Sequence, residues 1–159
     1  MTIHQANQHR ALLCFLQRDT VWPAYSHLQK MTFEQLKVFR IKFLYISRKG
    51  RGAFDGLKLL ANDGKHITVL KCENQAVEEK VELRDLARIA VLYGADQVED
   101  IQFFDRGNSL VAQISVSYKS NGFKERSYEV GEHEQFKGVE VVMSPQGNLS
   151  YFRPIFFCL

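Results

Sequence analysis

Hydrophobic and polar positions alternate with a period of two over several short stretches of the chain, which is typical of β-strands with one face in water. The clearest stretch is 112–118, where Ala112, Ile114, Val116 and Tyr118 alternate with polar side chains. The same kind of pattern, bounded by turn residues, predicts further strands. These lie at 38–47, 53–61, 66–73 and 98–105. The residues 76–82 are charged, and their pattern favours neither helix nor strand.

Turn signals separate the predicted strands. Asn62-Asp63-Gly64 is a strong hairpin signal between two of them. Arg106-Gly107-Asn108, Asn121-Gly122 and Pro145-Gln146-Gly147-Asn148 divide the second half into short segments. We therefore expect an antiparallel meander in the C-terminal part, and its last segment, "LSYFRPIFFCL", is apolar enough to pack as a strand.

Helical spacing predicts three further elements. Residues 3–18 place His9, Leu12, Leu13 and Leu16 on one stripe. Thr32 and Gln35 have the spacing of a capping box and predict the start of a short helix. Apolar residues also recur at helical spacing in a third segment, about 83–94, which Gly94 is placed to end. They are Leu86, Ala87, Ala90 and Val91.

These elements predict an α+β fold. The N-terminal helices precede a mixed or antiparallel β-sheet, the helix at about 83–94 covers that sheet, and the meander follows. The chain has 159 residues, of which 45% are hydrophobic. It is long enough for one domain with a hydrophobic core and too short for two well-packed domains. We expect a single domain over residues 1–159, whose oligomeric state the sequence leaves open.

Charge is distributed unevenly along the chain. Residues 1–60 hold 10 Lys and Arg against 3 Asp and Glu, and the remaining residues hold 11 against 15. The basic part includes the predicted hairpin "FLYISRKGRGAFDG", and on its first strand Arg40 and Lys42 share a face. The sequence therefore indicates a basic hairpin face. Its members are Lys30, Lys37, Arg40, Lys42, Arg48, Lys49, Arg51 and Lys58.

Our first interpretation is a non-catalytic protein that contacts nucleic-acid phosphates, DNA or RNA, through this face. The residues expected to bind are Arg40, Lys42, Arg48, Lys49, Arg51 and Lys58. A first alternative is an adaptor or inhibitor that offers the basic hairpin or a sheet edge to an acidic protein surface. A second alternative is an α+β protein with a small-ligand or enzymatic pocket lined by Phe and Tyr. A merely solvated basic face explains the charges as well.

Part of the chain resembles a known family of enzymes. "TFEQL" from Thr32, "GLKLLANDGKHITVLKC" from Gly56 and "VELRDLARIAVLYGAD" from Val81 follow one another in the order helix, strands, helix. This order over 32–105 is similar to the restriction-endonuclease-like PD-(D/E)xK core. The amino-acid sequence of these segments resembles the type IV restriction endonucleases in particular.

The chain departs from that family at the catalytic positions. Lys58 and Leu70 stand where the resemblance implies metal ligands, and Cys72 stands where it implies the catalytic lysine. Lysine and leucine cannot hold Mg²⁺. The resemblance therefore implies a nuclease fold without a working site, and no cleavage of DNA or RNA. Glu78-Glu79-Lys80 contains an E-x-K triplet, so a shifted site and a charged strand edge both stay open.

Little in the sequence predicts a cofactor, a metal ion or a membrane. The five histidines lack metal-ligand spacing, and we expect no catalytic residues, no metal and no cofactor. Three widely spaced cysteines, Cys14, Cys72 and Cys158, are expected to be free thiols. No apolar run reaches the ~18 residues of a membrane helix, and the N-terminal residues lack a signal-peptide pattern. We therefore expect a cytoplasmic protein without a membrane partner.

Overall fold

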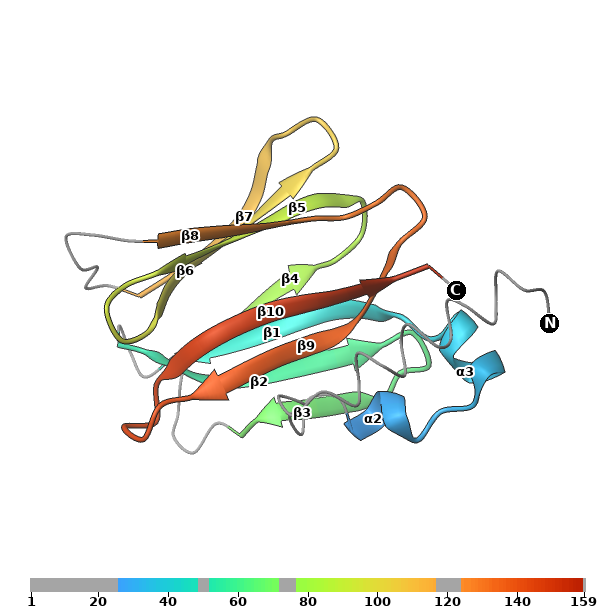
Figure 1. The fold of residues 1–159 in the computed structure, drawn as a ribbon, viewed down its shortest axis with the longest axis horizontal. Helices are drawn as coiled ribbons and strands as arrows, with labels where there is room; N and C mark the ends of the chain where they lie inside the picture. The colour runs from blue at the N-terminus through green and yellow to red at the C-terminus, as the bar shows by residue number, and fades with distance from the viewer. Residues whose placement is uncertain (1–25, 49–51, 72–76, 117–123, 159) are drawn as a thin grey trace.

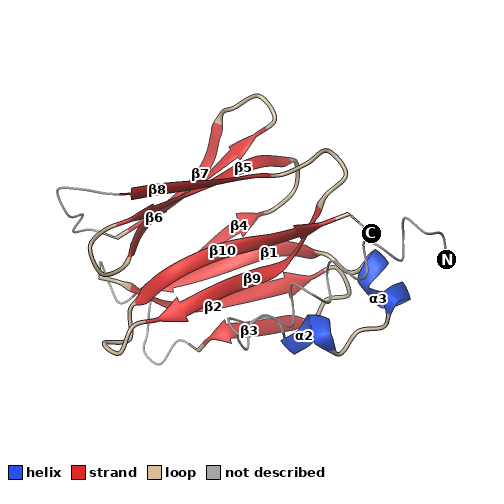
Figure 2. Cartoon of the chain, viewed as in Figure 1, coloured by secondary structure: helices blue, strands red, loops and turns tan. Residues whose placement is uncertain are grey.

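The structure is a computed structural model that describes residues 26–48, 52–71, 77–116 and 124–158. Strands take 62% of these residues and helices 8%. The predicted α+β fold class is therefore wrong, because the described chain is nearly all β (Figure 2). Two short helices, α2 (Ser26–Gln29) and α3 (Phe33–Val38), precede the first strand.

The described strands form three antiparallel sheets (Figure 1). Sheet A has the order β3-β2-β1-β4, sheet B has the order β7-β6-β5-β8, and sheet C pairs β10 with β9. The strands of sheet A are β1 (Ile41–Arg48), β2 (Phe54–Ala61), β3 (His66–Leu70) and β4 (Val77–Glu82). Those of sheet B are β5 (Leu86–Tyr93), β6 (Val98–Asp105), β7 (Leu110–Ser115) and β8 (Lys124–Glu129). Sheet C consists of β9 (Gln135–Met143) and β10 (Leu149–Phe157).

The inner faces of the three sheets meet in one hydrophobic cluster. Leu44 of β1, Phe103 of β6 and Phe152 of β10 are each 0% exposed and belong to this cluster. Because side chains alternate across a strand, each sheet directs one row of apolar side chains to the centre. The three sheets therefore enclose a single core, and their connections gather at its two ends (Figure 1).

The segment predicted as a covering helix at about 83–94 is wrong, because it forms strand β5. β5 is a central strand that pairs with both β6 and β8. Ile89, Ala90 and Val91 are all 0% exposed, so both faces of the strand are covered. A strand buried on two faces loses its alternation and becomes a continuous apolar run, which periodicity cannot separate from a buried helix. Gly94 lies in the connection to β6.

The predicted C-terminal antiparallel meander is also wrong, because β8 pairs back with β5 and β9 pairs with β10 in a separate sheet. Most other local predictions within the described residues are confirmed. Thr32 caps α3 through a complete capping box with Gln35. The predicted strands correspond to β1, β2, β3, β6 and β7, although β7 ends at Ser115, and the ambiguous segment 76–82 is strand β4. Gly64 makes the hairpin turn with φ 87°. The predicted helix at 3–18, Asn121-Gly122, Cys14 and Cys72 lie outside the described residues.

The helical segment packs against sheet C. His27 of α2 donates a hydrogen bond from Nε2 to the Lys137 carbonyl of β9 at 3.1 Å. A Cβ atom at the next residue, Gly138, would lie 3.2 Å from the His27 ring. Gly138 therefore permits this close approach of α2 to the strand. In the part of the chain that the structure describes, we find no helix with the length and apolar character needed to span a membrane.

Candidate functional site

A cleft of about 610 Å³ lies at one end of the three sheets. Strands β1, β5 and β9 begin there, and β4, β6 and β10 end there. Residues from all six of these strands or from their connections line the cleft. We call this part of the molecule the cleft end, and we call the opposite ends of the same strands the far end. The volume lies within the ~300–1,000 Å³ of small-ligand sites.

Charged side chains of both signs line the cleft. Four are basic, namely Arg40, Lys42, Arg84 and Arg106. Four are acidic, namely Glu82, Asp85, Glu132 and Glu134. The two sets balance in formal charge at neutral pH. The cleft therefore offers hydrogen-bond donors and acceptors in similar number, without the large single-sign field that selects a polyanion.

Two of these charged residues stabilise the wall of the cleft. Arg106 donates from Nη1 to the Val130 carbonyl at 2.8 Å and from Nη2 to the Gly131 carbonyl at 3.1 Å. The Gly131 N–H in turn donates to Glu134 Oε1 at 2.9 Å. These bonds join the β6–β7 turn to the connection between β8 and β9. Arg106 and Glu134 therefore hold this side of the cleft in shape.

Four other charged side chains of the cleft remain available for a ligand. Glu82, Glu132, Arg40 and Lys42 are exposed. Their side chains make no hydrogen bond or ion pair among the described residues. Two carboxylates and two cations can therefore bind a solute without first breaking a protein contact.

Aromatic side chains form the apolar part of the cleft. Phe136 and Phe156 line it and pack edge to face, with ring centroids 5.1 Å apart at an interplanar angle of 84°. Phe43 lines it from β1, and Lys80 Nζ lies 4.1 Å from the centroid of that ring. The cleft thus combines aromatic surface with free polar groups, which is the usual make-up of a small-molecule site.

The structure separates the residues that the sequence predicted to bind. Arg40 and Lys42 lie in the cleft, whereas Arg48 lies at the far end and Lys58 lies elsewhere in sheet A. Lys58 Nζ is 4.8 Å from the centroid of the Tyr45 ring and 4.0 Å from a carboxylate oxygen of Glu78. Lys49 and Arg51 lie outside the described residues.

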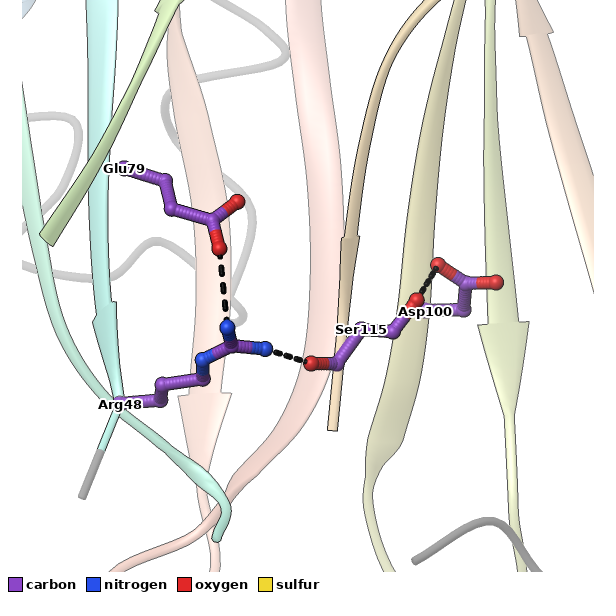
Figure 3. Close-up of polar contacts among 4 residues, drawn as sticks. All are labelled: Arg48, Glu79, Asp100 and Ser115. Atoms are coloured by element: carbon purple, nitrogen blue, oxygen red, sulfur yellow. Dashed lines mark hydrogen bonds and ion pairs between the residues drawn. The ribbon is translucent and has the colours of Figure 1, made fainter. Parts of the chain in front are cut away.

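Arg48 joins two sheets at the far end (Figure 3). Its Nη2 donates to Glu79 Oε1 at 3.0 Å, and its Nη1 donates to the Ser115 carbonyl of β7. Ser115 Oγ donates to Asp100 Oδ1 at 2.8 Å. Asp100 Oδ2 accepts a further bond from Gln113 Nε2 at 2.7 Å. Arg48 is therefore engaged in a contact between sheets A and B.

The residues named by the nuclease resemblance form no comparable site. Lys58 and Leu70 lie on β2 and β3, while Cys72 lies outside the described residues. In the E-x-K triplet, Glu78 is 4.0 Å from Lys58, Glu79 pairs with Arg48, and Lys80 covers Phe43. No group of three or more His, Cys, Asp and Glu in the described ranges is placed to hold a metal ion.

The sequence-based reasoning missed most of the cleft. Its acidic residues stand at chain reversals, in "ELRD" (82–85) and "GEHE" (131–134). Clusters of polar residues between apolar stretches mark such reversals. The prediction of a helix over 83–94 hid the first reversal, because it placed these charges on a helix start. Nothing in the local pattern indicates that the two reversals meet.

No protein-family model and no curated protein sequence matches this chain. Solved structures share its fold. A galactose-specific lectin from Artocarpus hirsuta, solved with methyl-α-D-galactose, has a TM-score of 0.55 and 11% identity over 74% of this chain and 92% of the lectin. The lectin MPA with T-antigen disaccharide has a TM-score of 0.54, 11% identity and the same coverage. The second β-prism domain of RbmC from V. cholerae has a TM-score of 0.55 and 17% identity, covering 74% and 88%.

The fold is therefore a β-prism, in which three sheets surround one core. This finding corrects the resemblance to the restriction-endonuclease-like core, which is a different fold. The interpretation as a nucleic-acid-binding protein is also wrong, because the structural neighbours are lectins. The same neighbours contradict the two alternatives, the adaptor with a basic hairpin and the α+β pocket protein.

Proposed function

We propose that this chain is a carbohydrate-binding protein that holds a neutral saccharide in the cleft. The observation that carries the proposal is the composition of the cleft: free carboxylates and free cations in equal number beside aromatic rings. The fold supports it by analogy, since β-prism lectins were solved with methyl-α-D-galactose and with T-antigen disaccharide.

The chemistry of sugars matches these side chains. A sugar hydroxyl both donates and accepts, so it pairs with a carboxylate through its hydrogen and with a cation through its oxygen. Glu82 and Glu132 supply acceptors, whereas Arg40 and Lys42 supply donors. Charged partners strengthen such bonds, each of which contributes about 1.5–3 kcal/mol. The apolar face of the sugar ring can pack against Phe156 in the cleft wall.

Binding to a glycan array, followed by calorimetry with the best neutral saccharide, tests the proposal. Methyl-α-D-galactose and T-antigen disaccharide are the first probes. We expect Glu132→Gln and Glu82→Gln each to weaken binding about tenfold, which corresponds to about 1.4 kcal/mol. Glu125→Gln is the matched control, because Glu125 is exposed on β8 and pairs with Leu92 away from the cleft. Its affinity should equal that of the wild type.

Two results would overturn the proposal. The first is a folded protein that binds no saccharide on the array or by calorimetry. The second is binding that survives both cleft variants and is lost in Tyr151→Ala, which would place the saccharide at the far end. Tyr151 is a fair marker of that end, because its ring stacks on Tyr93 at 6.4 Å between centroids.

A further inference from the structure

A second cavity of about 450 Å³ adjoins the cleft. Glu82, Arg84 and Asp85 line both cavities. The remaining wall of the second cavity includes Lys80 of β4 and Val111 of β7. Each volume by itself lies in the range of a small-ligand site. The two cavities therefore flank the short connection between β4 and β5.

Residues that line the two cavities contact each other where the cavities are separated. Phe43 lines the cleft, Lys80 lines the second cavity, and the Lys80 Nζ lies 4.1 Å from the centroid of the Phe43 ring. The connection between β4 and β5 is Leu83–Asp85, in which Arg84 Nε lies 3.4 Å from Asp85 Oδ2. Both of these side chains are 80% exposed. A ligand that lies across this connection would contact a donor, Arg84, and an acceptor, Asp85.

The backbone conformation of the β4–β5 connection allows the chain to reverse within three residues. Asp85 has φ 57°, a left-handed conformation that is uncommon outside glycine and that aspartate tolerates better than most residues. This conformation lets three residues reverse the chain between β4 and β5. The polar side chains of this reversal, Arg84 and Asp85, line the cavities on both sides.

The second cavity has the same mixed chemistry as the cleft. Asp105 Oδ1 accepts bonds from the Gly107 and Ser109 N–H groups at 2.9 Å, and Asp105 Oδ2 makes no hydrogen bond among the described residues. Val111 is 50% exposed and adds an apolar surface. Lys80 and Arg84 oppose the acidic residues Glu82, Asp85 and Asp105. Donors, acceptors and apolar surface thus continue beyond the cleft.

We infer that the two cavities form one extended site for a neutral oligosaccharide that crosses the β4–β5 connection. This inference rests on the proposed function, since it assigns the length of the saccharide that the cleft takes. The first sugar unit lies in the cleft, and the following units lie beside Lys80 and Val111. A longer saccharide therefore gains contacts that a monosaccharide cannot make.

Calorimetry with neutral oligosaccharides of one to four units, built on galactose, mannose and glucose, tests the inference. We expect at least a tenfold gain in affinity from one unit to four. Val111→Trp fills the second cavity from an exposed position, so it should remove this gain and leave monosaccharide affinity within twofold. Val111→Thr, which nearly keeps the shape, is the matched control and should retain most of the gain. Thermal melting confirms that both variants are folded.

The outcomes separate the two ideas. A monosaccharide that binds the cleft with no gain for longer chains would overturn the extended site and leave the proposed function standing. A gain that persists in Val111→Trp would also overturn the extended site. So would backbone NMR shifts at Lys80 and Val111 that stay unchanged when the longer saccharides bind. Absence of binding by every saccharide would overturn the proposed function itself.

Discussion

Lys137 and Arg48 are both cations that bind backbone carbonyl groups, and they lie toward opposite ends of the prism. Lys137 is 1% exposed near the cleft end, and its Nζ donates to the Leu36 carbonyl at 2.8 Å, the Phe39 carbonyl and Gln135 Oε1 at 3.0 Å. All three acceptors are neutral. Arg48 keeps 23% of its side chain exposed and pairs with the Glu79 carboxylate.

This difference in partners has an electrostatic consequence. Burial and, to a smaller extent, the nearby Arg40 charge together lower the pKa of the Lys137 ammonium to about 8, against a smaller opposing effect of Cys158. Arg48 pairs with a carboxylate and touches solvent, so it is held without a comparable loss of hydration. At the far end, the Glu79 carboxylate therefore balances the charge of Arg48, which we call a compensated cation. Near the cleft end, Lys137 is a buried cation whose three acceptors are all neutral, which we call an uncompensated cation.

The position of Lys137 also connects it to the cleft. It ties the end of α3 and the residue before Arg40 to strand β9, while Gln135 and Phe136 of the same strand line the cleft. Arg48 ties β1 to β4 and to β7, away from the cleft. Disturbing Lys137 should therefore alter both stability and the cleft, and disturbing Arg48 should alter stability alone.

The largest effect is expected from Lys137→Ala. This change removes a buried stem and leaves the Leu36 and Phe39 carbonyls without their donor, so we expect the free energy of unfolding to fall by about 3 kcal/mol. Urea unfolding followed by circular dichroism measures it. Lys137→Met keeps most of the packing and should lose less. A fall below about 1 kcal/mol for Lys137→Ala would show that the carbonyls find other partners.

A smaller effect is expected from Arg48→Ala. It leaves the Ser115 carbonyl and the Glu79 carboxylate unpaired, but both lie where water can reach part of the site, so we expect a loss of about 1.5 kcal/mol. Saccharide affinity in this variant should match the wild type. If Arg48→Ala costs more than Lys137→Ala, or if it weakens saccharide binding, the two ends do not differ as described.

The sequence predicted much of the local structure in the described residues. The turn at Gly64, the capping box of Thr32 and Gln35, and strand β6 at 98–105 all depend on neighbours in the chain, and pattern reasoning found them. It failed at β5, where burial on both faces removes the alternation that identifies a strand. Together with the predicted N-terminal helices and the predicted C-terminal meander, this error led to an α+β fold in place of a β-prism.

The cleft could be predicted only in part. Arg40 and Lys42 were named from the sequence as binding residues, but their acidic neighbours Glu82 and Glu132 come from reversals far along the chain. Lys137 follows Phe136 in a β-strand and has the pattern of a solvent-facing lysine. It is buried because α3 covers it, and such tertiary contacts leave no local signal.

The smallest expected effect is a dependence of stability on pH that only the cleft end produces. The folded protein releases the Lys137 proton near pH 8, whereas the unfolded chain releases it near the usual 10.5. Between these values the unfolded state binds more protons than the folded state. The free energy of unfolding therefore increases as pH rises from 8 toward 10.5 and decreases as pH falls toward 8. Relative to pH 7, the gain at pH 9 should be about 1 kcal/mol.

The difference between variants isolates this effect from other titrating groups. Burial raises the pKa of the Tyr93 and Tyr128 hydroxyls, so those groups act in the opposite direction and reduce stability as pH rises above about 10. They remain in every variant and cancel in a comparison. Urea unfolding at pH 7, 8 and 9 should show the gain in the wild type and in Arg48→Ala, and no gain from this source in Lys137→Met. Parallel pH profiles for the wild type and Lys137→Met would mean that Lys137 titrates alike in both states, and the contrast between a compensated and an uncompensated cation would then fail.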